Sequence, residues 1–349
     1  MMCKNCSQKK AVITVLLLAA AISILAGCAK KAAPASAAGG DGAVTGKLIV
    51  YTSMKESLIS GIKDEFLKQN PGIDMDYQSA GAGSLMAKIA AERESGRIMA
   101  DIIWTSEVPD FFKMKNEGIL IQYKPNGVGE ILNPLEGTED YFTPARLGTL
   151  GIVYNTKNIQ TPPASWDDLL KPEFKDAFSI ADPALSGTSF VSVALLKEKF
   201  GDEFFQKIRA NGAVIGKGSG QVVDDTASGE LSACLGVDYI AFDKIEKGAN
   251  LAIAYPPEIL CIPSPVAILK DTKSLDAAQK FVDFMMTKAA QQIIAENGTL
   301  PTRKDVAVPA KYNLPKAEDA MNNGIKIDYI KMINEREERI ASFKSIMQK

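Results

Sequence analysis

Two stretches, residues 47–53 (KLIVYTS) and residues 100–106 (ADIIWTS), decide the fold class. Each is an apolar run of strand length that ends in Thr-Ser, as expected where a buried strand meets a loop. After the first stretch a helix with an apolar face is expected from Leu58 to Phe66, and residues 73–77 (IDMDY) alternate as a further strand. Strands that alternate with helices predict a parallel sheet covered by helices, which is the α/β class.

The alternation resumes after a proline-rich region at residues 161–166 (TPPASW). The sequence therefore predicts a second α/β set, which agrees with a length greater than one hydrophobic core usually supports. Strands are expected at residues 147–155, 178–183, 213–215, 232–236 and 262–269, and helices at residues 188–199, 202–210, 277–293 and 324–347.

The overall composition is that of a globular protein, with 46% hydrophobic and 23% charged residues among 349. This excludes a disordered chain, a collagen and a polytopic membrane protein. The formal net charge is −2, and the leader at residues 1–27 holds three lysines and no acid, so the remainder is more acidic still. Nucleic acids and anionic membrane surfaces bind proteins that carry an excess of basic residues, so neither is an expected partner.

The chain contains no histidine. This excludes Ser-His-Asp and Cys-His catalysis, HExxH zinc sites and every other metal site with a histidine ligand. No cofactor is expected. Cys234 and Cys261 lack the paired spacing of a zinc site, so they are either buried free thiols or a disulfide formed in an oxidising compartment.

Residues 1–27 have the pattern of a signal peptide. A positively charged start precedes an apolar run at residues 11–26, which at about 16 residues is short for a membrane span. The run ends in LAGC at residues 25–28, which resembles a bacterial lipobox, so Cys28 is the expected lipidation site. An uncleaved signal anchor is the alternative.

The segment at residues 28–46 consists mostly of Ala, Gly, Lys and Ser. It holds too little apolar surface to fold, and we expect it to be a flexible tether. The mature protein is therefore expected outside the cytoplasm, anchored to a membrane through its lipid.

Small, hydroxyl-rich loops recur where a strand ends and a helix begins. In open α/β sheets such loops line the ligand crevice, and helix starts favour an anion. The alternative for each loop is that its serine only caps a helix. Five loops of this kind predict a shared polar cleft; they lie at residues 51–53, 79–84, 105–106, 186–189 and 217–220.

Acidic side chains are candidates for hydroxyl or ammonium groups of a ligand. Asp224 and Asp225 are adjacent, and Asp238 follows beside Tyr239. Their alternative is a set of solvated loop carboxylates. Neither phosphate motif tested is complete: residues 212–218 (GAVIGKG) fail as a P-loop, and residues 81–83 (GAG) lack the third glycine of a dinucleotide fingerprint.

Taken in order, several short motifs resemble bacterial ABC-transporter solute-binding proteins of the cluster that binds ferric iron, phosphonates, sugar phosphates and thiamine. The resemblance covers about residues 47–306. It is carried by residues 50–53 (VYTS), 81–89 (GAGSLMAKI), 100–104 (ADIIW), 151–155 (GIVYN), 165–170 (SWDDLL), 182–183 (DP), 186–188 (SGT), 263–268 (PSPVAI) and 300–303 (LPTR).

This resemblance implies a two-lobed α/β fold of the type II periplasmic-binding-protein kind, with lobes joined by crossover strands and closing on a ligand. Lobe 1 is expected at residues 47–150 and 262–300, and lobe 2 at residues 151–261 and 301–349. The implied function is capture of a small anionic solute, an organic phosphate such as a phosphosugar or aminophosphonate, for an ABC permease and its ATPase. A monomer is expected.

The expected site combines the loops with the acids. Iron-binding members use a histidine, a carboxylate and two adjacent tyrosines, whereas Asp238-Tyr239-Ile240 offers one tyrosine, so ferric iron is the alternative cargo. A sensor or adhesin lipoprotein, or an enzyme on the same fold, is the alternative of another class. The candidate solute-binding residues are Thr52, Ser53, Gly83, Ser84, Ser106, Ser186, Gly187, Thr188, Asp224, Asp225, Asp238 and Tyr239.

Overall fold

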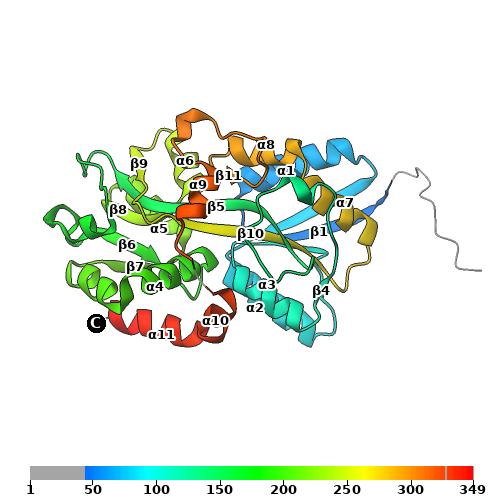
Figure 1. The fold of residues 1–349 in the computed structure, drawn as a ribbon, viewed down its shortest axis with the longest axis horizontal. Coiled ribbons are helices and arrows are strands. Elements are labelled where there is room, and N and C mark those ends of the chain that lie inside the picture. The colour runs from blue at the N-terminus through cyan, green and yellow to red at the C-terminus, as the bar shows by residue number, and fades with distance from the viewer. Residues whose placement is uncertain (1–43, 327, 349) are drawn as a thin grey trace, which may run out of the picture. The chain divides into compact units, whose positions relative to one another are not determined.

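The structure, a computed structural model, describes residues 44–326 and 328–348. The predicted signal peptide, Cys28 and the tether up to residue 43 lie outside the described residues. Figure 1 shows the folded part as a mixed sheet with helices packed on both of its faces.

The strands form one continuous sheet with the order β2-β1-β3-β10-β5-β8-β6-β7. β1, β2 and β3 are mutually parallel at one end, and β6, β7 and β8 are parallel at the other. The strands are β1 Gly46–Thr52, β2 Ile73–Ser79, β3 Ile102–Trp104, β4 Leu120–Ile121, β5 Thr143–Asn155, β6 Phe178–Ala181, β7 Val214–Gly216, β8 Ala233–Val237, β9 Leu251–Ala254, β10 Leu260–Leu269 and β11 Leu300–Pro301.

Two long antiparallel strands, β5 and β10, pair with each other in the middle of the sheet. β10 also pairs with β3, and β5 also pairs with β8. They cross between the two parallel ends, so the two-lobed α/β prediction is confirmed. Here lobe 1 denotes the part around β1–β3, and lobe 2 denotes the part around β6–β8 (Figure 1).

Helices cover the sheet in both lobes, and short 3₁₀ turns connect them. The helices are α1 Glu56–Gln69, α2 Ala82–Glu94, α3 Val108–Asn116, α4 Gly187–Ala210, α5 Ser219–Ser228, α6 Asp238–Glu246, α7 Leu275–Met285, α8 Lys288–Glu296, α9 Ala317–Asn323, α10 Tyr329–Asn334 and α11 Arg336–Met347. The 3₁₀ turns are η1 Val128–Glu130, η2 Trp166–Leu170, η3 Pro172–Phe174 and η4 Ala310–Tyr312.

The first helix is built as its sequence pattern predicts. Leu58, Ile59, Ile62 and Phe66 of α1 are all fully buried. They join the hydrophobic core that also contains Leu48 of β1. Burying side chains of this size contributes roughly 1.5–3 kcal/mol each, which is why the apolar face of the helix determines how it packs.

The two predicted helices at residues 188–199 and 202–210 are confirmed: α4 consists of two helical segments separated by a kink at Gly201, whose φ of 72° is outside the helical range. Two other predicted helices differ in their boundaries. The predicted helix at residues 277–293 is divided at Thr287, whose side chain caps α8. The predicted C-terminal helix is likewise divided, and α10 and α11 meet at Glu335.

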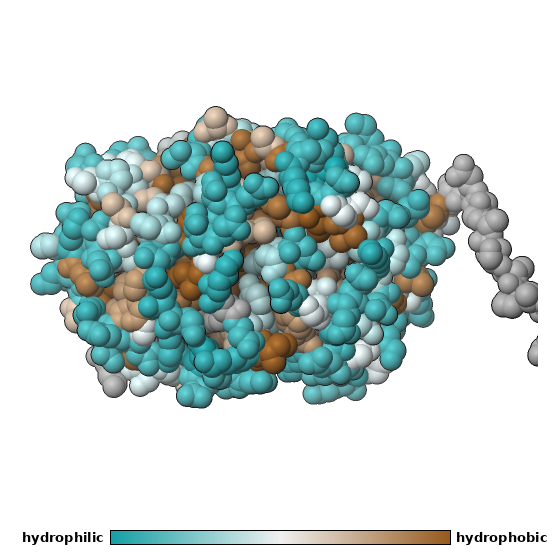
Figure 2. Space-filling model, viewed as in Figure 1, coloured by the Kyte–Doolittle hydropathy of each residue, from teal (hydrophilic) through white to brown (hydrophobic). Residues whose placement is uncertain are grey.

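Hydrophilic residues predominate on the face shown in Figure 2, and hydrophobic residues lie there in separate small patches. Among the helices of the described residues, none has both the length and the hydrophobicity needed to span a bilayer. Cys234 and Cys261 are both free, so no disulfide joins them.

Candidate functional site

A cavity of about 400 Å³ lies between the lobes. This volume is within the usual range for small-molecule sites. The cavity is lined by Ser53, Lys55, Ser79, Ala80, Gly81, Ala82, Ser84 and Ser106 of lobe 1 and by Leu185, Ser186, Gly187, Thr188, Lys217, Gly218, Ser219, Gly220, Gln221, Val237, Tyr239 and Ile240 of lobe 2.

Five helices begin at this cavity. Their N-cap residues all line it: Lys55 for α1, Gly81 for α2, Ser186 for α4, Gly218 for α5 and Val237 for α6. The N–H groups of a first helical turn have no partner within the helix and carry partial positive charge. Their convergence makes the cavity favourable for an anion.

Hydroxyl groups also line the cavity, and some of them already form hydrogen bonds within the protein. Ser186 accepts a hydrogen bond from the Ser189 N–H at 3.2 Å, and its Oγ lies 2.7 Å from the Oγ of Ser219. Ser53 Oγ accepts from the Ser106 N–H at 3.3 Å. The helix-capping interpretation and the cavity interpretation therefore both hold for Ser186.

Two lysines supply full positive charge. Lys55 extends from the start of α1 so that its ammonium group lies beside Gly220 of lobe 2, and Lys217 directly precedes the N-cap of α5. Neither lysine has an ion-pair partner in the described part of the chain. Among the residues that line the cavity, none is Asp or Glu.

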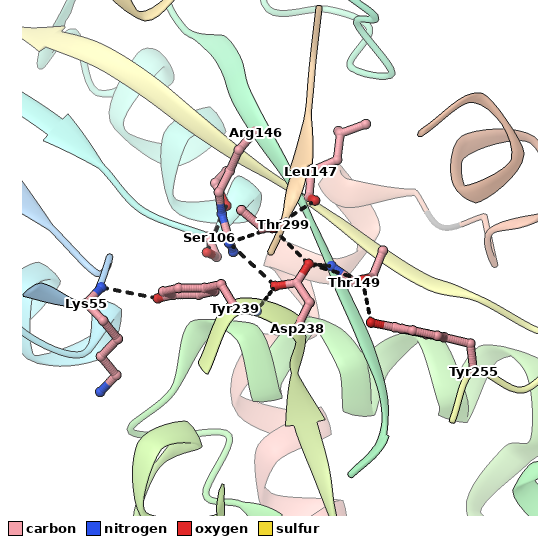
Figure 3. A network of polar contacts seen from close by, with 10 residues as sticks. Lys55, Ser106, Arg146, Leu147, Thr149, Asp238, Tyr239, Tyr255 and Thr299 are labelled. Atoms are coloured by element: carbon pink, nitrogen blue, oxygen red, sulfur yellow. Dashed lines mark hydrogen bonds and ion pairs between the residues drawn. The ribbon is translucent and has the colours of Figure 1, made fainter. Parts of the chain in front are cut away.

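Two cavity residues, Lys55 and Tyr239, belong to a buried polar network that also contains Asp238 and Arg146 (Figure 3). Tyr239 lines the cavity, and the guanidinium of Arg146 lies 4.6 Å from the centroid of its ring. Tyr239 Oη accepts a hydrogen bond from the backbone N–H of Lys55 at 3.2 Å, which joins the two lobes. Burial raises the pKa of the Tyr239 hydroxyl, so this group is neutral.

Asp238 lies at the centre of this network and is completely buried. Its Oδ2 accepts from the Thr149 N–H at 2.8 Å and from the hydroxyls of Thr149 and Thr299 at 3.1 and 2.8 Å. Its Oδ1 lies 3.7 Å from Arg146 Nη1. Burial raises the pKa of Asp238, while Arg146, the N–H groups of Thr149 and Tyr239, and the Thr299 hydroxyl favour the ionised carboxylate.

The structure brings seven of the candidate residues to the cavity: Ser53, Ser84, Ser106, Ser186, Gly187, Thr188 and Tyr239. It does not bring the carboxylates there. Asp238 points into the buried network, Asp224 pairs with Lys244 at 2.5 Å, and Asp225, which does not line the cavity, accepts a hydrogen bond from Gln221. Helical geometry is the reason, because residues 224 and 225 lie more than a turn beyond the N-terminus of α5.

Thr52 and Gly83 also lie outside the lining. Thr52 is fully buried, and its hydroxyl accepts from the Met54 N–H at 3.1 Å, so it supports the loop. Gly83 has a steric role: a Cβ there would lie 2.8 Å from the carbonyl oxygen of Ala184 in lobe 2. A Cβ at Gly81 would lie 2.9 Å from the Leu185 carbonyl oxygen. The lobes therefore touch at this rim, and this arrangement is called the closed form below.

The residue that sequence analysis missed is Lys55. The signal for it was its place two residues after Ser53, directly before a predicted helix. Lys217 and Ser219 belong to a loop that the sequence identified, but not as individual site residues.

No cluster of three or more metal-binding His, Cys, Asp or Glu side chains occurs within residues 44–326 and 328–348. The donors around the cavity are hydroxyls, amides and ammonium groups, which suit an anion better than the hard cation Fe³⁺.

Comparisons with known proteins agree with this fold. Residues 97–332 match the family described as bacterial extracellular solute-binding protein. A putative 2-aminoethylphosphonate-binding periplasmic protein of Salmonella paratyphi A is 25% identical, over 70% of this chain and 73% of that protein.

Two solved structures illustrate the range of similar proteins. The periplasmic binding protein AfuA from Actinobacillus pleuropneumoniae, with fructose-6-phosphate bound, superposes with a TM-score of 0.73, covering 86% of this chain and 98% of that one at 22% identity. Iron-bound HitA from Pseudomonas aeruginosa gives a TM-score of 0.72 over 86% and 99%, at 21% identity. Because the family match spans more than half of the sequence, this chain belongs to the bacterial extracellular solute-binding proteins.

Proposed function

We propose that this protein captures a small organic phosphate or phosphonate between its lobes and delivers it to an ABC permease and its ATPase. One observation carries the proposal: five helix N-termini and two lysines meet at a cavity whose lining has no carboxylate. A dianionic phosphoryl group would gain hydrogen bonds from free N–H groups and hydroxyls there, and attraction from Lys55 and Lys217.

Three of the candidate residues are proposed as the core of the anion seat. Ser186, Gly187 and Thr188 form the start of α4, and Ser84 faces them from the start of α2 in lobe 1. A phosphoryl group between the two helix starts would contact both lobes, so binding would favour the closed form.

The composition of the cavity lining favours a phosphosugar over an aminophosphonate. An ammonium group is best held by a carboxylate, and the lining offers none, whereas sugar hydroxyls can pair with serine and glutamine side chains. Of these two ligand classes, the phosphosugars therefore match the cavity lining better. Placement outside the cytoplasm, lipid anchoring through Cys28 and a transport role without catalysis belong to the same proposal.

The test is thermal unfolding and calorimetry with a fixed panel: inorganic phosphate, fructose 6-phosphate, 2-aminoethylphosphonate, ferric citrate and spermidine. A solute at 100 times its Kd stabilises the folded protein by about 2.7 kcal/mol. The phosphate compounds should raise Tm and bind one to one. A stoichiometric ferric complex, or stabilisation by spermidine alone, would overturn the proposal.

A further inference from the structure

The two C-terminal helices connect the lobes by a route separate from the crossover strands. α10 packs on α3 of lobe 1, and α11 packs on α4 of lobe 2 (Figure 1). Tyr329 of α10 stacks on Phe112 with ring centroids 6.4 Å apart, and Phe343 of α11 meets Phe205 edge-on at 5.2 Å. Residues 329–347 are called the C-terminal strap below.

Arg336 lies at the junction of the two strap helices and contacts both lobes. Its guanidinium donates a hydrogen bond to Glu107 and lies 3.6 Å from Oδ1 of Asp110, both at the start of α3 in lobe 1. The same group lies 4.6 Å from the ring centroid of Phe190, which belongs to α4 of lobe 2. One side chain therefore bridges the lobes.

This contact is shielded from water. Glu107 is fully buried, and the side chains of Asp110 and Arg336 are 13% and 22% exposed. Ion pairs between exposed side chains are weak, whereas breaking a buried pair leaves a charge without compensation and is strongly unfavourable. Separating the lobes would have to break either the pair with Glu107 or the contact with Phe190.

The contact also lies directly behind the cavity. The carboxylate of Glu107 packs against Gly187, the first residue of α4, and a Cβ at position 187 would clash with it. None of Arg336, Glu107 and Phe190 lines the cavity. Their effect on a solute must therefore act through the position of the α4 N-terminus relative to lobe 1.

We infer that Arg336 is an interlobe clasp that stabilises the closed arrangement and so positions both halves of the solute site without touching the solute. If only the closed form binds tightly, the apparent Kd is the intrinsic Kd divided by the closed fraction. Loss of the clasp should lower that fraction. The solute part of this inference rests on the proposed function, but the effect on lobe closure does not.

The chain offers a matched control in Arg339, one turn further along α11. Arg339 is also buried, and it pairs with Glu335 at 2.6 Å and Glu198 at 3.6 Å, in the strap and in α4. Its ion pairs do not reach lobe 1. Arg339→Gln therefore removes a buried arginine of the same helix while leaving the clasp in place.

The experiment compares wild type, Arg336→Gln and Arg339→Gln by small-angle scattering, without ligand and along a titration with inorganic phosphate, and by calorimetry with the same ligand. Arg336→Gln should have a larger radius without ligand, and its Kd should rise at least tenfold. Arg339→Gln should lower Tm but keep the radius and the Kd of wild type. If Arg336→Gln fails to fold, Phe190→Leu removes the lobe 2 contact and leaves the charges in place.

Each outcome decides the inference. Equal radii for Arg336→Gln and wild type, with and without phosphate, would overturn the clasp. A Kd increase that Arg339→Gln reproduces would show general destabilisation instead, and would also overturn it. If wild type binds no phosphate, the proposed ligand class fails, and the radius of the ligand-free variants still decides whether Arg336 holds the lobes together.

Discussion

Replacing Asp238 by Ala tests whether this carboxylate supports the cavity or binds the solute. In the structure it is completely buried, accepts three hydrogen bonds from Thr149 and Thr299, and lies 3.7 Å from the buried Arg146. Removing one member of a buried ion pair costs about 3–5 kcal/mol, because the other charge stays buried without a partner. With an unfolding entropy of about 2.1 cal/mol/K per residue over roughly 300 folded residues, we expect Tm to fall by about 5–8 °C.

The assay pairs this variant with Asp225→Ala. Asp225 is a partly exposed side chain whose side-chain hydrogen bond is with Gln221, so its loss should change stability by less than about 0.5 kcal/mol. Urea unfolding gives the free energies, and calorimetry gives the Kd for inorganic phosphate and for 2-aminoethylphosphonate. Stability within 0.5 kcal/mol of wild type for Asp238→Ala, with a tenfold loss for the amine-bearing ligand alone, would refute the supporting role.

Four further predictions follow from the site and its surroundings. Thr188→Val should weaken phosphate binding tenfold or more by calorimetry, because a hydrogen bond to a charged ligand contributes about 1.5–3 kcal/mol. Lys55→Gln should weaken it roughly fivefold and flatten its dependence on salt in a titration at several ionic strengths. Burial and neighbouring Asp110 raise the pKa of Glu107, against the opposite effect of Arg336; the folded form therefore holds its proton to higher pH than the unfolded chain, and this site should make the free energy of unfolding fall as pH rises from about 4.5 through the folded-state pKa. Cys28→Ser should release the protein from membranes in a fractionation experiment, since stable anchoring needs the added lipid.

Each of these has a control or a contrary outcome. Ser228→Ala, at the far end of α5, is the matched loss of a hydroxyl for Thr188→Val and should leave binding unchanged. An unaltered salt dependence after Lys55→Gln would place this ammonium away from the anion. Glu107→Gln should remove the part of the pH dependence that comes from this site, and an identical pH profile would contradict the raised pKa. Retention of Cys28→Ser in carbonate-washed membranes would favour a signal anchor.

Local sequence patterns were sufficient for most of the regular elements. The α1 helix and its neighbouring strands follow from short-range periodicity, since the spacing of Leu58, Ile59, Ile62 and Phe66 alone defines a buried face. The division of the C-terminal helix was not predictable in this way. Its boundary at Glu335 separates a segment that packs on lobe 1 from one that packs on lobe 2, and packing partners are not encoded in a single helix's periodicity.

The same distinction holds for the site. Hydroxyl-rich loops at strand ends could be recognised because strand ends and helix starts are local features, and Ser53, Ser84 and Ser186 do line one cavity. The acids could not be assigned, because the direction of Asp225 depends on its turn of α5 and that of Asp238 on a network of residues distant in sequence.

By itself the sequence determined the α/β class, the absence of histidine chemistry and the hydroxyl-bearing loops, all of which depend on composition or on neighbours along the chain. Only the tertiary structure decided that the cavity carries lysines without carboxylates, that Asp238 lies beneath it, and that Arg336 joins the lobes. These features arise from contacts between residues as far apart in the sequence as Glu107 and Arg336. Electrostatic interactions depend on the distance between charges in space, not on their separation along the chain.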